Sequence, residues 1–232
     1  QWYEGDKERL KLAVSRYMEG AKVVKGLGAI RGIIVPHAGH IYSGPVAGYA
    51  YKQVQGASYD AVVVIAPNHV DPGLRFSSVF PHGAYTTPLG RIPVDDTLAK
   101  AVADFSASDD VRASDAGHLT GYGGRMEHSV EIQLPFLQVA LGDFKFVPIV
   151  MGAQTITSCE ALAKAVAAAV KGKNVLLVAS SDLSHFHDAA TARKLDSVVR
   201  SYVESYDPVG LLGALDSNRC EACGGGPIAV VM

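Results

Sequence analysis

The chain has few cysteines, no long apolar run and no excess of charge of either sign. Its three cysteines cannot build a disulfide framework, and its N-terminus lacks the basic start and apolar core of a signal peptide, so we expect a reducing, cytoplasmic setting. With 21 basic against 23 acidic residues, the chain has no basic footprint for nucleic acid. Its longest apolar windows, such as 161–170, fall short of the roughly 20 residues that a membrane span needs. These absences predict no nucleic-acid or membrane partner and favour small molecules or proteins.

Length and hydrophobic content predict a single domain. The chain has 232 residues, of which 48% are hydrophobic, enough for one α/β domain with a sizeable core. It opens with "QWYEGD" and stops at "PIAVVM", in what reads as the middle of an element. We therefore expect one domain over 1–232 that is truncated at both ends.

Short apolar runs alternate with longer segments of helical period. This pattern is typical of a mostly parallel or mixed central sheet with helices on both faces. The predicted strands are 29–35, 61–66, 144–150 and 174–179. The predicted helices are 7–18, 45–54, 95–105, 130–141, 158–170, 189–205 and 208–214. Residues 74–93 predict a hairpin, and the glycine- and aspartate-containing segment 106–125 predicts a long loop.

Three of the predicted strands end in side chains that can bind metals. The first strand leads to His37, the second to His69, and the last to Asp182 and His185. Runs this apolar are expected where helices cover both faces of a sheet, and ligands bind beyond the carboxyl ends of such strands. Imidazoles on rigid strand ends suit zinc, copper or iron. The sequence therefore predicts a site at this edge of the sheet.

Several residues near these strand ends allow more than one interpretation. Asp182 could bind a metal or orient a histidine, and His185, on the same side of a predicted helical turn, could act as a general acid or base. Residues 180–182 could instead cap the next helix. His40 could contact a residue that itself binds the ligand, or it could be exposed. His187 is expected to face solvent.

A further histidine and a cysteine complete the set of candidates. His128 follows the glycine-rich segment and precedes a predicted helix, which favours a functional place for it. Glu131 is equally consistent with a capping-box acid and with catalysis. Cys220 and Cys223 form a single C-x-x-C pair, which is weak evidence for structural zinc. Cys223 is followed by three glycines and by Pro227, which is expected to start a helix and so to favour the thiolate.

The ordered motifs of the chain resemble those of the Memo family, also called component B of the AmmeMemoRadiSam system. They are "WYEG", "PHAGHIYSG", "YKQV", "APNH", "TPLG", "EHSVEIQLPFL", "VPIVMG", "SSDLSHF" and "CGGGPI", and together they cover nearly the whole chain. The resemblance implies a fold similar to class III extradiol dioxygenases, which use non-haem iron(II) to cleave catechol rings.

The same resemblance implies a metal site and its neighbours. The family's two histidines and one cysteine around a metal match His37, His69 and Cys223, with iron(II) or copper as the ion. The ligand types themselves leave zinc possible as well. Asp182, His185 and His128 match residues of the same pocket. We expect Asp182 to assist the metal site, and His185 and His128 to move protons or hold substrate.

A thiolate ligand departs from the dioxygenase pattern, in which two histidines and a carboxylate hold the iron. Sulfur shifts the preference toward copper(I), zinc or iron in a different electronic state, so fold likeness alone does not establish ring cleavage. Three functions stay open. The first is a metal-dependent redox enzyme acting on a small substrate. The second is a non-enzymatic protein that binds a phosphorylated or carboxylated ligand or a partner of a multi-component system, and the third is zinc-dependent hydrolysis.

Overall fold

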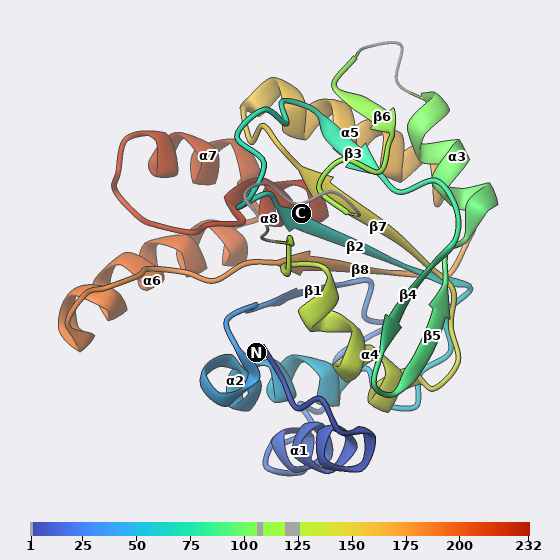
Figure 1. Cartoon of the computed structure of the whole chain (residues 1–232). Coiled ribbons are helices and arrows are strands. Elements are labelled where there is room, and N and C mark those ends of the chain that lie inside the picture. The colour runs from blue at the N-terminus through green and yellow to red at the C-terminus, as the bar shows by residue number, and fades with distance from the viewer. Residues whose placement is uncertain (1, 106–108, 119–125) are drawn as a thin grey trace.

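Among the described residues, six strands form a mixed central sheet (Figure 1). The computed structural model describes residues 2–105, 109–118 and 126–232. The strand order is β1-β8-β2-β7-β3-β6. The first four strands run parallel, β3 is antiparallel to β7, and β6 is parallel to β3. This arrangement confirms the predicted α/β fold with a mostly parallel sheet.

The strands follow the apolar runs of the sequence. Their bounds are β1 Gly32–Val35, β2 Ala61–Pro67, β3 Ser77–Val79, β6 Val111–Ala113, β7 Phe146–Met151 and β8 Val175–Ser180. The central strands β2 and β7 are buried over their whole lengths. Val64 pairs with Val178 of β8 on one side and with Pro148 of β7 on the other. Burying one such aliphatic side chain contributes about 1.5–3 kcal/mol, so this apolar centre stabilises the sheet.

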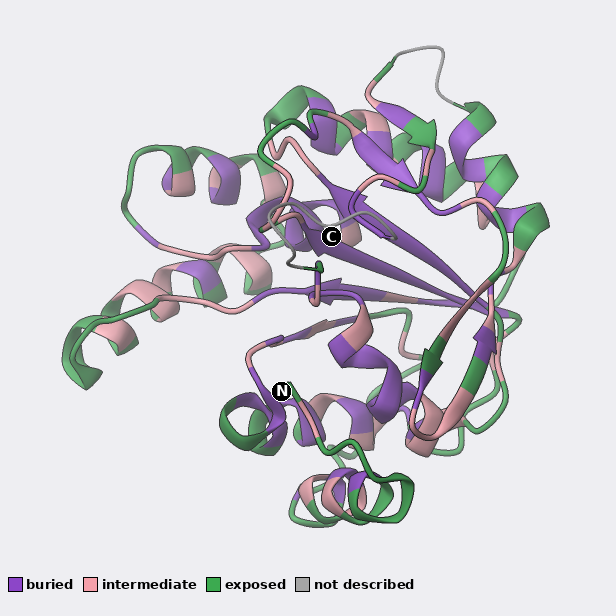
Figure 2. Cartoon of the chain, in the orientation of Figure 1, coloured by how far each residue is buried: buried purple, intermediate pink, exposed green. Residues whose placement is uncertain are grey.

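Helices cover both faces of the sheet, as predicted (Figures 1 and 2). One face carries α1 Lys7–Glu19, α2 His40–Gln53 and α4 Leu134–Leu141. The other face carries α3 Asp96–Phe105, α5 Ile156–Ala169 and α8 Gly225–Val231. Beyond α8 lie α7 Pro208–Asp216 and α6 Ala189–Glu204, which pack against each other. No helix in the described ranges combines the length and apolar character needed to cross a bilayer.

Two helices begin more than two residues away from their predicted starts. The predicted helix 45–54 already begins at His40, because Pro45 is accommodated inside it and its missing hydrogen bond falls on an exposed turn. The predicted helix 130–141 opens with a 3₁₀ turn, η1 Glu131–Gln133, before α4. Pro135 has no N–H to give to the first turn of an α-helical ladder.

The segments between the main elements also differ from prediction. The expected loop 106–125 contains strand β6, while residues 106–108 and 119–125 lie outside the described part of the chain. Within 74–93, the hairpin consists of β4 Ala84–Thr87 and β5 Gly90–Pro93, and β3 instead joins the central sheet. Strands of three residues are too short to show a period in sequence.

Candidate metal centre

The carboxyl ends of β1, β2 and β8 lie side by side because these strands are parallel neighbours of one sheet. They carry His37, His69 and Asp182 to the same edge. Cys223 reaches this edge from a distant part of the chain, in the turn between α7 and α8. The structure thus brings the three predicted metal ligands together, with one nitrogen or sulfur atom of each within 4.8 Å of the others.

Backbone hydrogen bonds pin the Cys223 turn to the loop after β8. The amide of Cys223 donates to the carbonyl of Asp182 (3.2 Å), and the amide of Gly224 donates to Ser181 Oγ (2.9 Å). Gln154 Nε2 donates to the carbonyl of Cys223 (2.9 Å). A Cβ at position 224 would lie 2.3 Å from the carbonyl oxygen of Ser180, so only glycine permits this approach. The helix after this turn starts at Gly225 rather than at the predicted Pro227. Its first backbone hydrogen bond runs from the amide of Ile228 to the carbonyl of Gly224.

His37 is almost fully buried, and its backbone and ring are both held. Its amide donates to Asp182 Oδ1 (2.7 Å), and its ring Nδ1 lies 2.9 Å from Ser180 Oγ. Ring Nε2 faces Cys223 Sγ at 3.1 Å. Burial lowers the pKa of His37 to about 4, although the charge of Asp182 opposes that shift. The imidazole is therefore neutral near pH 7, which is the form that binds metals.

The hydrogen bonds around Ser180 fix which nitrogen of His37 carries the proton. The single hydroxyl proton of Ser180 goes to the carbonyl of Ser129 (2.7 Å), and its oxygen accepts from Gln133 Nε2 (2.8 Å). Gln133 is oriented in turn, because its other amide atom, Oε1, accepts from Tyr51 (2.8 Å). Ser180 Oγ can therefore only accept from Nδ1–H of His37. Nε2 keeps its lone pair free on the side of Cys223.

A buried carboxylate, Glu127, holds His69 in the same way. Its Oε1 lies 3.1 Å from His69 Nδ1, and its Oε2 accepts from the His69 amide. Since a carboxylate accepts, Nδ1 carries a proton and Nε2 is left for a ligand role. Burial lowers the pKa of His69, but hydrogen bonds to Cys223 and Glu127 outweigh it and raise the pKa to about 10. A metal ion binding here would have to displace the second ring proton, on Nε2, while the Nδ1 proton stays bonded to Glu127.

These donors fit a metal ion. Two imidazole nitrogens and one cysteine sulfur match the ligand types of zinc, copper and iron, and three such protein ligands would leave a position open for another molecule. The carboxylate of Glu127 also lies within 4.8 Å of ring nitrogens of His69 and His128, but its two oxygens already accept from the amides of His69, His128 and Ser129 and from His69 Nδ1. It orients the ligand instead.

Asp182 and His185 also lie at the site, on the loop after β8. This loop is not helical, in contrast to the predicted turn, and helix α6 is capped by Asp188 rather than by residues 180–182. Asp182 Oδ2 nevertheless lies 3.9 Å from His185 Nε2. His185 is exposed at the edge, and the exposed ring of His187 pairs with Glu221 (2.8 Å). The catalytic roles of Asp182 and His185 stay predictions.

His128 forms one wall of a pocket that opens beside the three ligands. Its ring centre lies 5.7 Å from that of His37 and 5.3 Å from that of His69, and Trp2 stacks on it at 3.7 Å with the planes parallel. Burial lowers the pKa of His128, so its ring is neutral near pH 7. The pocket has a volume of about 430 Å³ and is lined by Trp2, His69, Val70, Met126 and His128.

Several residues of the site escape sequence reasoning. Glu127, Ser180 and Gln133 orient the histidines, but their partners are up to 143 positions away, so no local pattern reveals them. Glu131, for which the sequence favours a cap or catalysis equally, makes no capping hydrogen bond and instead accepts a hydrogen bond from the Tyr3 hydroxyl. His40 is buried, and its Nε2 lies 3.0 Å from the carbonyl of Ile132.

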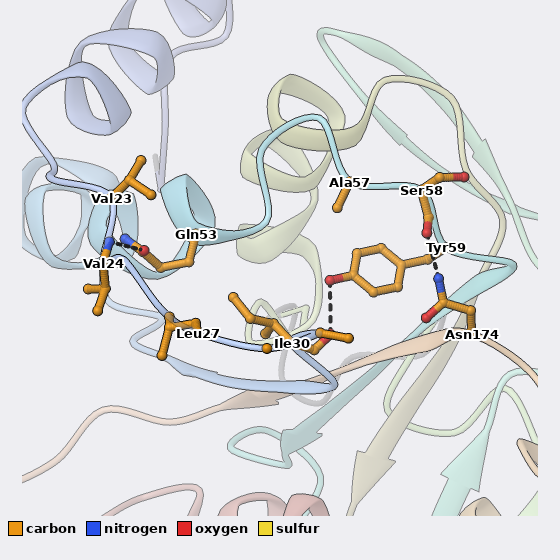
Figure 3. Close-up of a pocket in the computed structure, with 11 residues that line it drawn as sticks. Val23, Val24, Leu27, Ile30, Gln53, Ala57, Ser58, Tyr59 and Asn174 are labelled. Carbon is orange, nitrogen blue, oxygen red and sulfur yellow. Dashed lines mark hydrogen bonds between the residues drawn. The ribbon is translucent and has the colours of Figure 1, made fainter.

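A second hollow, of about 330 Å³, lies at the opposite end of the strands (Figure 3). Ile30, Tyr59 and Asn174, which precede β1, β2 and β8, line it together with Val24 and Gln53. Its polar groups bond to each other: the Tyr59 hydroxyl donates to the Ile30 carbonyl (3.0 Å), and Gln53 accepts from the Val24 amide (2.8 Å). It therefore offers no converging ligands, unlike the His37 edge.

The fold and the site define an α/β protein with a cluster of metal-ligand type, two histidines and a cysteine, at the carboxyl edge of its sheet. The family model described as "Memo-like protein" matches residues 1–232, and the chain belongs to the Memo family. A MEMO1 family protein of Methanobrevibacter smithii is 39% identical over 203 residues, which are 86% of this chain and 69% of that protein. The MEMO1 family protein of Nitrosopumilus maritimus is 31% identical over 238 residues, covering 100% of this chain and 83% of that protein.

Proposed function

We propose that this protein is a metal-dependent redox enzyme, with a dioxygenase-like site, that acts on a small organic substrate. Its ion, iron or copper, is held by His37, His69 and Cys223. The observation that carries this proposal is that ligand atoms of His37, His69 and Cys223 lie within 4.8 Å of one another, with His37 Nε2 3.1 Å from the sulfur and each imidazole fixed by a bonded Nδ1. When bound, the ion supplies a Lewis acid and a redox centre.

The surrounding residues support a reaction rather than storage. The pocket beside the ligands is open and lined mainly by apolar and aromatic groups, which suits a small organic molecule. His128, neutral and held flat against Trp2, can take a proton from a substrate bound there. Asp182 holds the His37 backbone and places a second carboxylate oxygen toward the ring.

The proposal is tested by purifying the chain anaerobically without a histidine tag and measuring its metal content by elemental mass spectrometry. We expect close to stoichiometric iron or copper, and its loss in His37→Ala and Cys223→Ser. Cys220→Ser is the matched control, because Cys220 is buried away from the ligands and should keep the metal. Oxygen consumption with catechols then measures turnover.

Two outcomes would count against the proposal. Full metal content in His37→Ala and Cys223→Ser would show that the ligands are wrong. A loaded wild type that consumes no oxygen with any small reductant or catechol would favour the alternative, a protein that binds a ligand or partner at this pocket without turnover.

A further inference from the structure

The single tryptophan of the chain has one ring face covered and the other open. Trp2 stacks on His128 with the ring centres 3.7 Å apart and the planes parallel. In the described part of the chain, Trp2 makes no other ring contact and no cation–π contact. Trp2 is nevertheless 46% exposed, so its second face is accessible to a ligand.

A hollow of about 490 Å³ opens beside this ring and contains a fixed carboxylate. It is lined by Trp2, Tyr3 and Glu131, together with Gly5 and residues 86–88. Glu131 is half-buried, and its Oε1 accepts a hydrogen bond from the Tyr3 hydroxyl. Among the residues that the structure describes, no group bonds to its Oε2. The hollow therefore offers a carboxylate that is held in place and has one oxygen free to accept from a ligand.

The charge that lines this hollow is negative. An adjoining hollow of about 230 Å³ shares Trp2 and Tyr3 and adds the carboxylate of Glu4. As far as the structure describes the chain, neither hollow is lined by a lysine or an arginine. Arg91 pairs with Thr86 across β4 and β5, but it lines a different hollow. Carboxylates and the faces of tryptophan and tyrosine all attract cations, so the lining favours a positively charged ligand over an anion.

We propose that the larger hollow binds a small organic ammonium ion, a primary amine on an aromatic or alkyl body. The –NH₃⁺ group donates to Glu131 and is attracted by the rings of Trp2 and Tyr3. The volume of this hollow lies within the usual range for small ligands, about 300–1,000 Å³, whereas the hollow beside Glu4 is smaller and Glu4 is exposed. Trp2 also lines the pocket beside His128, so the ammonium site adjoins the pocket of the proposed function but needs no metal.

The test is to titrate the metal-free chain with phenethylammonium, phenethyl alcohol and hydrocinnamate, which have similar bodies and carry a positive, no and a negative charge. Calorimetry and the fluorescence of Trp2 follow binding. We expect saturable binding of the ammonium ion, and binding of the other two that is about 10- to 100-fold weaker, because they form no charge-assisted hydrogen bond with Glu131. Glu131→Gln should weaken ammonium binding to a similar extent, while its amide oxygen still accepts from Tyr3. Glu4→Gln is the matched control and should keep the affinity of the wild type.

Several results would overturn the ammonium site. Equal affinities for the three compounds would show apolar binding alone, and tighter binding of hydrocinnamate would show an anion site instead. An absence of saturable binding of phenethylammonium at millimolar concentrations would also refute the site. Loss of binding in Glu4→Gln rather than in Glu131→Gln would place the ion in the smaller hollow and refute the assignment. Because the chain is metal-free, each of these results leaves the proposed function standing. Thermal melting of each variant shows whether a lost affinity is a lost fold.

Discussion

Replacing Glu127 with glutamine should weaken metal binding while leaving the protein folded. The carboxylate accepts from His69 Nδ1 (3.1 Å), from the His69 amide, and from the amides of His128 (2.8 Å) and Ser129 (3.0 Å). Glutamine has nearly the same shape but only one accepting oxygen. At least one of these N–H groups therefore loses its partner, and the ring of His69 loses a charged anchor.

The size of the effect follows from these bonds. Removing a group that orients a metal-binding histidine costs about 10- to 100-fold in affinity, or about 1.4–2.8 kcal/mol. A buried N–H left without an acceptor costs about 1–3 kcal/mol of folding stability. We therefore expect Glu127→Gln to bind zinc about 10- to 100-fold more weakly in a chelator competition. The free energy of unfolding of the metal-free variant should fall by about 1–3 kcal/mol.

The same variant should change how stability depends on pH. Burial raises the pKa of Glu127, but hydrogen bonds from His69 and Ser129 outweigh it and lower the pKa from 4.5 to about 2. Because the folded-state pKa is depressed, the carboxylate stabilises the fold fully above about pH 4.5, and this contribution is lost as the pH falls toward 2. Glu127→Gln should lose this part of the acid dependence in urea unfolding of the metal-free protein.

Glu131→Gln is the matched control, since Glu131 binds the Tyr3 hydroxyl and not a histidine. It should keep the zinc affinity of the wild type. If Glu127→Gln binds zinc as tightly as Glu131→Gln does, the Glu127 carboxylate does not orient His69 and the reasoning fails.

Three further predictions concern the cysteines, the glycine turn and the single tryptophan. Iodoacetamide should modify Cys223 of the metal-free protein well before Cys159, whose pKa burial raises to about 12, and peptide mass spectrometry that finds Cys159 modified first would contradict the assigned burial. Gly224→Ala should cost about 1–3 kcal/mol and weaken metal binding, because its Cβ would lie 2.3 Å from a backbone oxygen of β8. Gly213→Ala, with nothing within 4 Å of its Cβ, should instead stabilise helix α7 by about 0.5–1 kcal/mol. Equal melting temperatures of the Gly224→Ala and Gly213→Ala variants would refute this difference between the two glycines. Fluorescence of Trp2 should fall when copper is added, and an unchanged signal would place the ion away from the stacked ring.

The sequence predicts the strands that carry the site but not the network that orients it. Buried strands such as β2 and β7 can be predicted from the sequence because every residue in them is apolar or small. Their parallel direction is predicted from the helices that connect the strands. Strand β6 is missed because three residues carry no period. The bond from Gln133 to Ser180 joins segments 47 positions apart, and only the folded chain shows it.

The position of Cys223 has a different physical cause from the positions of the histidines. The parallel strands β1, β2 and β8 end at the same edge of the sheet, so residues that directly follow them lie close together there. Cys223 follows no strand, and it reaches this edge only because Gly224 lets the turn before α8 approach the β8 backbone closely. Gly224 is therefore part of the candidate metal centre. A substitution there should remove the sulfur from the site as effectively as replacing Cys223 itself, while His37 and His69 keep their own hydrogen bonds to Ser180 and Glu127.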